Sequence, residues 1–186
     1  MSYLFIDKWG DNSILVNYNR RNTTHPLFLL LATIIKEFEE VFFVSFNDVN
    51  YDKQRIIDLI IDKRINKIVV YADVDNLNSI QNSELLQHYN KLVNLYIFSI
   101  NTNFKCSHDN FYDYITFNER EDINSNIIKI LKHLNLKHNK RNWNNTIIDY
   151  SLVKQIKGET FLITVGTGCN RKCSFCNIAN SIPFLS

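Results

Sequence analysis

Three of the four cysteines in this 186-residue chain stand close together, at Cys169, Cys173 and Cys176. Cysteine thiolates hold iron–sulfur clusters and also bind zinc, and a compact loop that carries several of them can wrap a metal centre without long-range folding. The fourth, Cys106, stands far upstream, so the set suits metal ligation better than two disulfides of a secreted protein. The pattern therefore predicts a metal site in a reducing compartment. The N-terminus shows no basic stretch followed by a long apolar run, and no segment is long and apolar enough to span a membrane, so we expect a cytoplasmic protein.

The spacing of these cysteines is CxxxCxxC, and the aromatic Phe175 stands directly before the third of them. At this point the sequence resembles the radical S-adenosylmethionine (radical SAM) superfamily. The resemblance implies a 4Fe-4S cluster on Cys169, Cys173 and Cys176, whose fourth iron is left for the amino and carboxylate groups of S-adenosylmethionine. It also implies cofactor contacts for Gly168 and for Phe175, the latter near the adenine.

The same resemblance implies an activity. In this superfamily the reduced cluster cleaves S-adenosylmethionine, for radical or methyl-transfer chemistry, and it receives its electron from a donor of the flavodoxin or ferredoxin type. The substrate is unknown, because the parts of such enzymes that recognise the substrate are absent from this sequence. Their absence, and the end of the chain ten residues after Cys176, lead us to expect a fragment of a longer enzyme.

A different class of function stays open. The cysteine loop could be vestigial or could bind zinc, which needs a fourth ligand and usually takes two separated CxxC pairs. The chain would then be a non-catalytic binding or interaction module.

Upstream of the cysteines, short β-rich runs alternate with amphipathic helical stretches. This alternation predicts an α/β domain with a doubly wound, flavodoxin-like or Rossmann-like parallel sheet of five strands. The helices are expected to begin at Pro26, near residue 53, near Ser83 as an N-cap, and near residue 123. The strands are expected at 14–18, 41–46, 67–71, 95–100 and 114–117.

This order of elements resembles the N-terminal cobalamin-binding domain of one large radical SAM class, with the resemblance carried by residues 14–40. Ligands of such folds bind outside the carboxyl ends of the strands, here the loops 17–25, 46–51 and 72–79. His25 ends the first loop, where a histidine is more often a cap or a surface residue than a ligand contact. Cobalamin stays an open alternative, because no glycine occurs between Gly10 and Gly158 and no Asp-x-His-x-x-Gly motif is present.

The predicted organisation has three parts: a cobalamin-binding-type domain over 1–136, a linker over 137–158, and the first strand (160–165) and cysteine loop of an incomplete radical SAM barrel over 159–186. Hydrophobic residues make up 45% of the chain and charged residues 22%, as in folded soluble proteins. The net charge of +2 gives no signal for nucleic-acid binding, and no apolar run predicts a membrane span.

Overall fold

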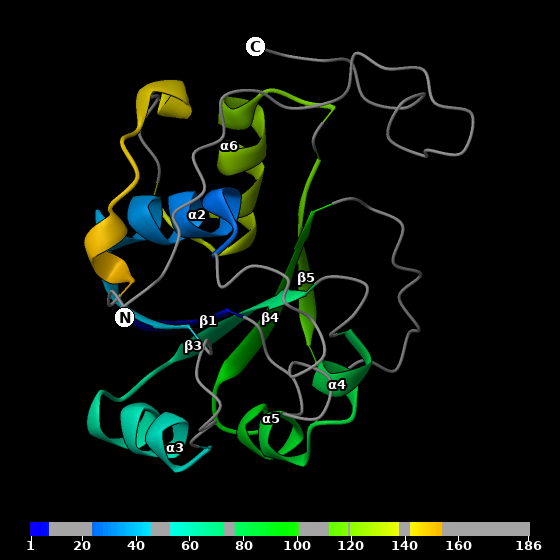
Figure 1. The fold of residues 1–186 in the computed structure, drawn as a ribbon. Helices are drawn as coiled ribbons and strands as arrows, with labels where there is room; N and C mark the ends of the chain where they lie inside the picture. The colour runs from blue at the N-terminus through cyan, green and yellow to red at the C-terminus, as the bar shows by residue number, and fades with distance from the viewer. Residues whose placement is uncertain are drawn as a thin grey trace.

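The computed structural model of the chain describes residues 1–7, 24–45, 53–72, 77–100, 112–118, 120–137 and 142–153. They form an α/β domain around one sheet of five strands, all parallel, in the order β2-β1-β3-β4-β5 (Figure 1). The α/β class and the five-stranded parallel sheet predicted from the sequence are thus confirmed. The strands are β1 (Ser2–Asp7), β2 (Glu40–Ser45), β3 (Lys67–Ala72), β4 (Asn94–Ile100) and β5 (Asp113–Phe117).

Four of the five strands lie where the sequence pattern predicts them, and the first does not. The expected strand at 14–18 lies outside the described residues, whereas β1 occupies the very start of the chain. All six residues of β1 are buried, because β1 runs inside the sheet between β2 and β3 and is covered on both faces. A strand buried on both faces reads as a continuous apolar run, here from Tyr3 to Ile6.

Helices cover both faces of the sheet, as in a doubly wound fold. Helices α2 and α6 lie on one face, and α3, α4 and α5 lie on the other (Figure 1). Helix α4 is a correction, because the sequence pattern predicts a loop over 72–79, and α4 begins within it at Leu77. The helices are α2 (Pro26–Lys36), α3 (Lys53–Asp62), α4 (Leu77–Gln81), α5 (Glu84–Tyr89) and α6 (Ile123–His133).

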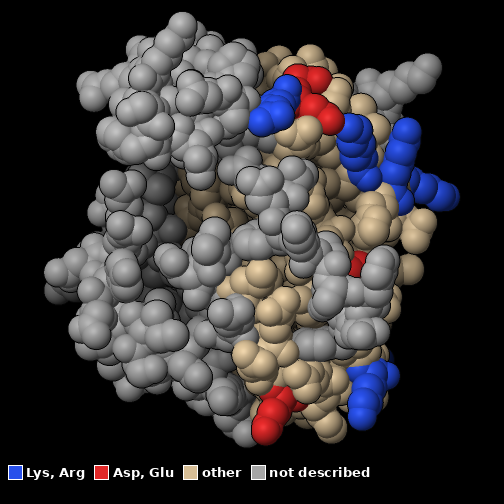
Figure 2. Space-filling view, turned by 90° about the vertical axis from the view of Figure 1, so that its right-hand side faces the viewer, with Lys and Arg blue, Asp and Glu red and all other residues tan. Residues whose placement is uncertain are grey.

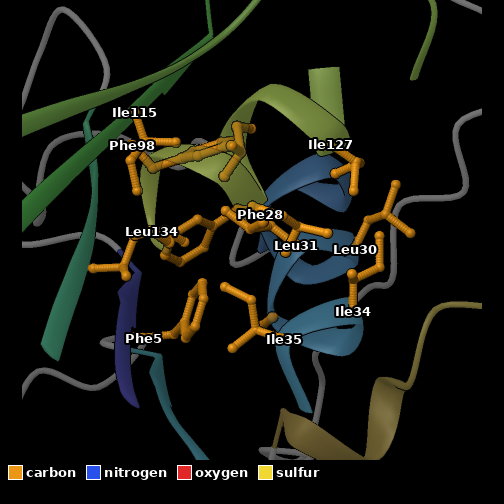
Figure 3. Packing of buried hydrophobic residues seen from close by; sticks show 14 of the residues in the cluster. Phe5, Phe28, Leu30, Leu31, Ile34, Ile35, Phe98, Ile115, Ile127 and Leu134 are labelled. Carbon is orange, nitrogen blue, oxygen red and sulfur yellow. The ribbon is translucent and has the colours of Figure 1, made fainter. Parts of the chain in front are cut away.

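The alternation of side chains along the strands builds two separate cores. Phe5 and Phe98 point to the α2 and α6 side, where they pack with Phe28 and Ile35 of α2 (Figure 3). Their neighbours in sequence, including Ile6 and Ile97, point to the other side and pack under α3, α4 and α5. Each face of the sheet therefore has its own hydrophobic core.

The ends of α3 and α6 use the same motif. Arg64 and Asn135 adopt positive φ values of 48° and 57°, although neither is glycine. The amide of Ile65 donates to the carbonyl of Ile60 (3.0 Å), and the amide of Leu136 donates to that of Leu131 (2.9 Å). These are Schellman motifs, in which a left-handed residue ends the helix and the next apolar residue returns to the core.

Residues 142–153, here called the strap, pack against α2 and α6. The strap contains two short 3-10 helices, η1 (Trp143–Asn145) and η2 (Tyr150–Leu152). Trp143 is only 2% exposed and belongs to the core under α2 and α6, whereas the polar sequence around it predicts a linker. A single tryptophan in a polar stretch has no periodicity, so only its tertiary contacts reveal that it is buried.

A buried lysine closes the carboxyl end of α6. Lys67, at the start of β3, donates from Nζ to the carbonyl of Leu134 (2.8 Å) and to the hydroxyl of Tyr3 (2.9 Å). The ammonium also lies 5.1 Å from the ring centre of Tyr3 and 6.0 Å from that of Tyr96. Burial lowers the pKa of Lys67, although Glu39 opposes this shift, and burial raises the pKa of Tyr3. The cation thus compensates the negative end of the helix dipole.

We expect Lys67→Met to lower the free energy of unfolding by about 2 kcal/mol, because it leaves the buried Leu134 carbonyl and Tyr3 hydroxyl without this donor. Urea unfolding followed by circular dichroism measures the change. Lys132→Met is the matched control, since Lys132 is exposed in the last turn of the same helix and should change stability by less than about 0.5 kcal/mol. Equal stabilities of the two variants would contradict the capping role.

Candidate functional site

The predicted metal ligands Cys169, Cys173 and Cys176 lie outside the described residues, as do Gly168 and Phe175. The lone Cys106 lies outside them as well. Within the ranges that the structure describes, no group of three or more histidine, cysteine, aspartate or glutamate side chains could hold a metal ion.

The described domain does contain the edge at which folds of this kind bind ligands. The sheet order places β1 next to β3, while the helix after β1 covers one face and the helices after β3 cover the other. This reversal is the topological switch point, and ligands of open α/β sheets bind beside it at the carboxyl ends of the strands. Asp7 ends β1 there in register with Ser45 of β2, and Ala72 of β3 is in register with Ser99 of β4.

Two polar residues at this edge are almost completely buried. Asp7 and Ser99 are each only 1% exposed. Asp7 shares the strand face of Tyr3 and Phe5, because alternate residues of a strand point to the same side. Its carboxylate therefore belongs to the α2 side of the switch point. Neither Asp7 nor β1 is predicted from the sequence pattern, although an aspartate directly after the four apolar residues 3–6 is a signal for the end of a buried strand.

His25 lies on the same side, at the start of α2. Its Nδ1 accepts a hydrogen bond from the amide of Leu27 (3.2 Å), and its carbonyl accepts from the amides of Phe28 and Leu29. The imidazole stacks on Tyr71 with ring centres 5.6 Å apart and planes 18° apart. His25 is thus the N-cap of α2, which confirms the capping alternative.

The environment of His25 keeps its imidazole neutral. Burial lowers the pKa of His25 to about 4, since the charged form loses its hydration there. Because Nδ1 accepts a hydrogen bond, the remaining proton is assigned to Nε2. At neutral pH this side chain is therefore a hydrogen-bond donor through Nε2 and a very weak base.

Aromatic rings fill the space between α2 and the carboxyl half of the sheet. The ring of Phe28 on α2 lies 5.2 Å from that of Phe5, 5.7 Å from Phe43, 5.6 Å from Tyr71 and 5.3 Å from Phe98. Phe28 is completely buried at the centre of this group (Figure 3). The group packs α2 onto the sheet and supports His25 through Tyr71.

The loops predicted as a ligand crevice are described only at their ends. Residues 17–23, 46–51 and 73–76 lie outside the described residues, so the structure places Thr24, His25, Ala72 and the backbone of 77–79. A shallow, open depression of about 610 Å³ lies instead at the opposite, amino-terminal edge of the sheet. Its wall combines Lys36, Lys63 and Arg64 with Glu37, Glu39 and Glu40, and the ammonium of Met1 pairs with Glu39. The wall therefore favours neither anions nor cations.

Among the described residues on the face seen in Figure 2, lysine and arginine side chains stand in small groups, some beside acidic ones. No helix in the described part of the chain is long and apolar enough to cross a membrane.

No protein-family model, curated protein or solved structure matches this chain.

Proposed function

We propose that this chain is part of a radical SAM iron–sulfur enzyme, in which Cys169, Cys173 and Cys176 bind a 4Fe-4S cluster. The observation that carries the proposal is the CxxxCxxC spacing, with the aromatic Phe175 before the third cysteine. The parallel α/β domain that precedes the cysteines supports it, because the radical SAM class that the sequence resembles has a doubly wound domain in this place.

The donor set fits the cluster. Three thiolates occupy three irons of a cubane and leave the fourth iron open for a cofactor, whereas four cysteines would close the site. Gly168 directly precedes Cys169, Phe175 directly precedes Cys176, and both would contact S-adenosylmethionine. When bound, the cluster supplies the electron that cleaves this cofactor, and the electron comes from a flavodoxin-type or ferredoxin-type donor. The residues of this chain hold the cluster, orient the cofactor and set access to both.

Cobalamin fits the described residues poorly. The sequence contains no glycine between Gly10 and Gly158, and glycine is the residue that lets a backbone approach a ligand such as the nucleotide tail closely. On the α2 side of the switch point, the rings around Phe28 already occupy the space between helix and sheet. We therefore assign no step to cobalamin.

Metal analysis tests the proposal. Anaerobic reconstitution with iron and sulfide should give about four iron atoms and about four sulfides per chain. S-adenosylmethionine should then change the electron paramagnetic resonance spectrum of the reduced protein, because it binds the open iron. Stoichiometric zinc without iron in protein purified directly from cells would instead identify the non-catalytic binding module with a zinc-bound cysteine loop.

A further inference from the structure

We propose that the outer edge of β2 pairs with the same edge of a second copy of this chain, so that two five-stranded sheets join into one. The inference does not depend on the proposed function. β2 is one of the two outer strands of the sheet, and in the described part of the chain no strand pairs with its outer edge. Such an edge presents a row of backbone N–H and C=O groups that a further strand can satisfy.

β2 lacks the features by which outer strands usually avoid this pairing. It contains no lysine, arginine or proline, and its only charged residue, Glu40, stands at its start. It pairs with β1 in an unbroken register over all six residues, so no bulge twists the strand away. The interior residues of β2 are all apolar, whereas β5, the other outer strand, has the hydroxyls of Tyr114 and Thr116 between its ends. The edge of the sheet without protection is therefore that of β2.

The apolar side chains of β2 keep part of their surface exposed. Residues 41–43 are only partly buried, whereas their register partners on β1, residues 3–5, are each 0% exposed. Val41 and Phe43 pack against the core under α2, and Phe42 packs against the core on the opposite face of the sheet. A strand laid against β2 would therefore cover apolar surface on both faces.

Charge selects the direction in which a second copy fits. Glu40 is exposed at the amino end of β2. A parallel copy would bring Glu40 close to the same residue of its partner, and like charges on neighbouring strands destabilise the pair. An antiparallel copy, related by a two-fold axis perpendicular to the sheet, places the two carboxylates at opposite ends of the new ladder. The edge therefore fits a second copy of itself in the antiparallel direction.

The apolar residues of β2 are complementary to themselves in this direction. A two-fold axis at Phe42 places this ring opposite its own copy, and it places Val41 opposite Phe43 on either side of the axis. Opposed residues of an antiparallel pair point to the same face of the sheet, and Val41 and Phe43 both face α2. Pairs of two aromatic rings, or of an aromatic ring and a β-branched side chain, stabilise antiparallel strands. We therefore place the two-fold axis at Phe42.

Sedimentation equilibrium of the full chain under reducing conditions tests the proposal. At about 100 µM the wild type should have twice the chain mass of 22.0 kDa. Phe42→Lys removes the central ring pair and puts two like charges at the axis, so it should raise the dimer dissociation constant at least about 30-fold. A wild type that is monomeric at this concentration, or a dimer that Phe42→Lys leaves unchanged, would overturn the proposal.

Tyr114→Lys is the matched control on the opposite edge of the sheet. Tyr114 is also a partly buried aromatic residue of an outer strand, and it packs against the same core as Phe42. Its exchange for lysine should leave the dimer dissociation constant within about threefold of the wild type. Equal weakening by both variants would contradict the assignment of the interface to β2.

A second measurement needs no variant, and it decides the question even where Phe42→Lys fails to fold. Amide hydrogen exchange of the wild type is compared at about 5 and about 200 µM, because only the dimer population depends on concentration. Exchange in β2 should slow at the higher concentration, while exchange in β5 should stay the same. A dimer that forms without this slowing in β2 would overturn the proposal.

Discussion

Replacing Cys169, Cys173 and Cys176 together by alanine is expected to lower the iron bound after anaerobic reconstitution from about four atoms per chain to none. In the proposed cluster each thiolate would bond one iron directly, and no group of three or more other metal-binding side chains occurs among the residues that the structure describes. The visible absorbance of the cluster should disappear with the iron. Total iron, acid-labile sulfide and the absorption spectrum measure the effect.

Cys106→Ala is the control for this variant, because Cys106 stands outside the CxxxCxxC segment. It should keep the full iron content. Iron that survives the triple replacement, or that is lost equally with Cys106→Ala, would contradict the assignment of the three ligands. Far-ultraviolet circular dichroism of the triple variant should match the wild type, since the described sheet and helices contain none of these cysteines.

The second large effect concerns acid stability, through His25. Its pKa is about 4 in the folded chain and near 6.5 when the chain unfolds, so the unfolded state takes up a proton first as the pH falls. The contribution of His25 is therefore complete above about pH 6.5 and is lost between pH 6.5 and 4. The full loss amounts to about 3 kcal/mol.

His25→Asn isolates this contribution, because asparagine is a good N-cap that does not titrate in this range. At pH 7 the variant should be less stable by about 1 kcal/mol, since it loses the ring stacking on Tyr71. The order should reverse as the pH approaches 4.5 in urea unfolding series. His88→Asn, an exchange at an exposed position of α5, should follow the wild type. Parallel curves for His25→Asn and the wild type would contradict the buried, neutral cap.

The sequence predicts those parts of the fold whose signal is periodic and local. Helix α6 begins at Ile123 as expected, since its apolar residues recur at helical spacing and Asp122 caps it. The expected cap of α5 is also correct, because the Ser83 hydroxyl accepts from the amide of Leu86 (3.3 Å). Strands β2 to β5 follow from short β-rich runs between polar turns.

The missed parts have signals that are short or purely tertiary. Helix α4 has only five residues, too few for a helical period to stand out from a loop. Trp143 becomes a core residue only through its contacts with Phe38 and Asn124. In the sequence, Lys67 is indistinguishable from an ordinary charged residue at the start of a strand. Its capping role is visible only in the folded structure, where Nζ donates to the carbonyl of Leu134. These contacts of Trp143 and Lys67 are made with residues that are far away in the sequence.

The residues in left-handed conformation that end α3 and α6 also affect the conformational entropy of the unfolded chain. Arg64 and Asn135 occupy backbone conformations that glycine adopts without a steric penalty, and the whole chain holds only four glycines. A side chain at these positions costs strain in the native state, but it also restricts the backbone before folding. The unfolded chain therefore has fewer accessible backbone conformations and loses less conformational entropy on folding. This entropy gain opposes the local strain at the two helix ends.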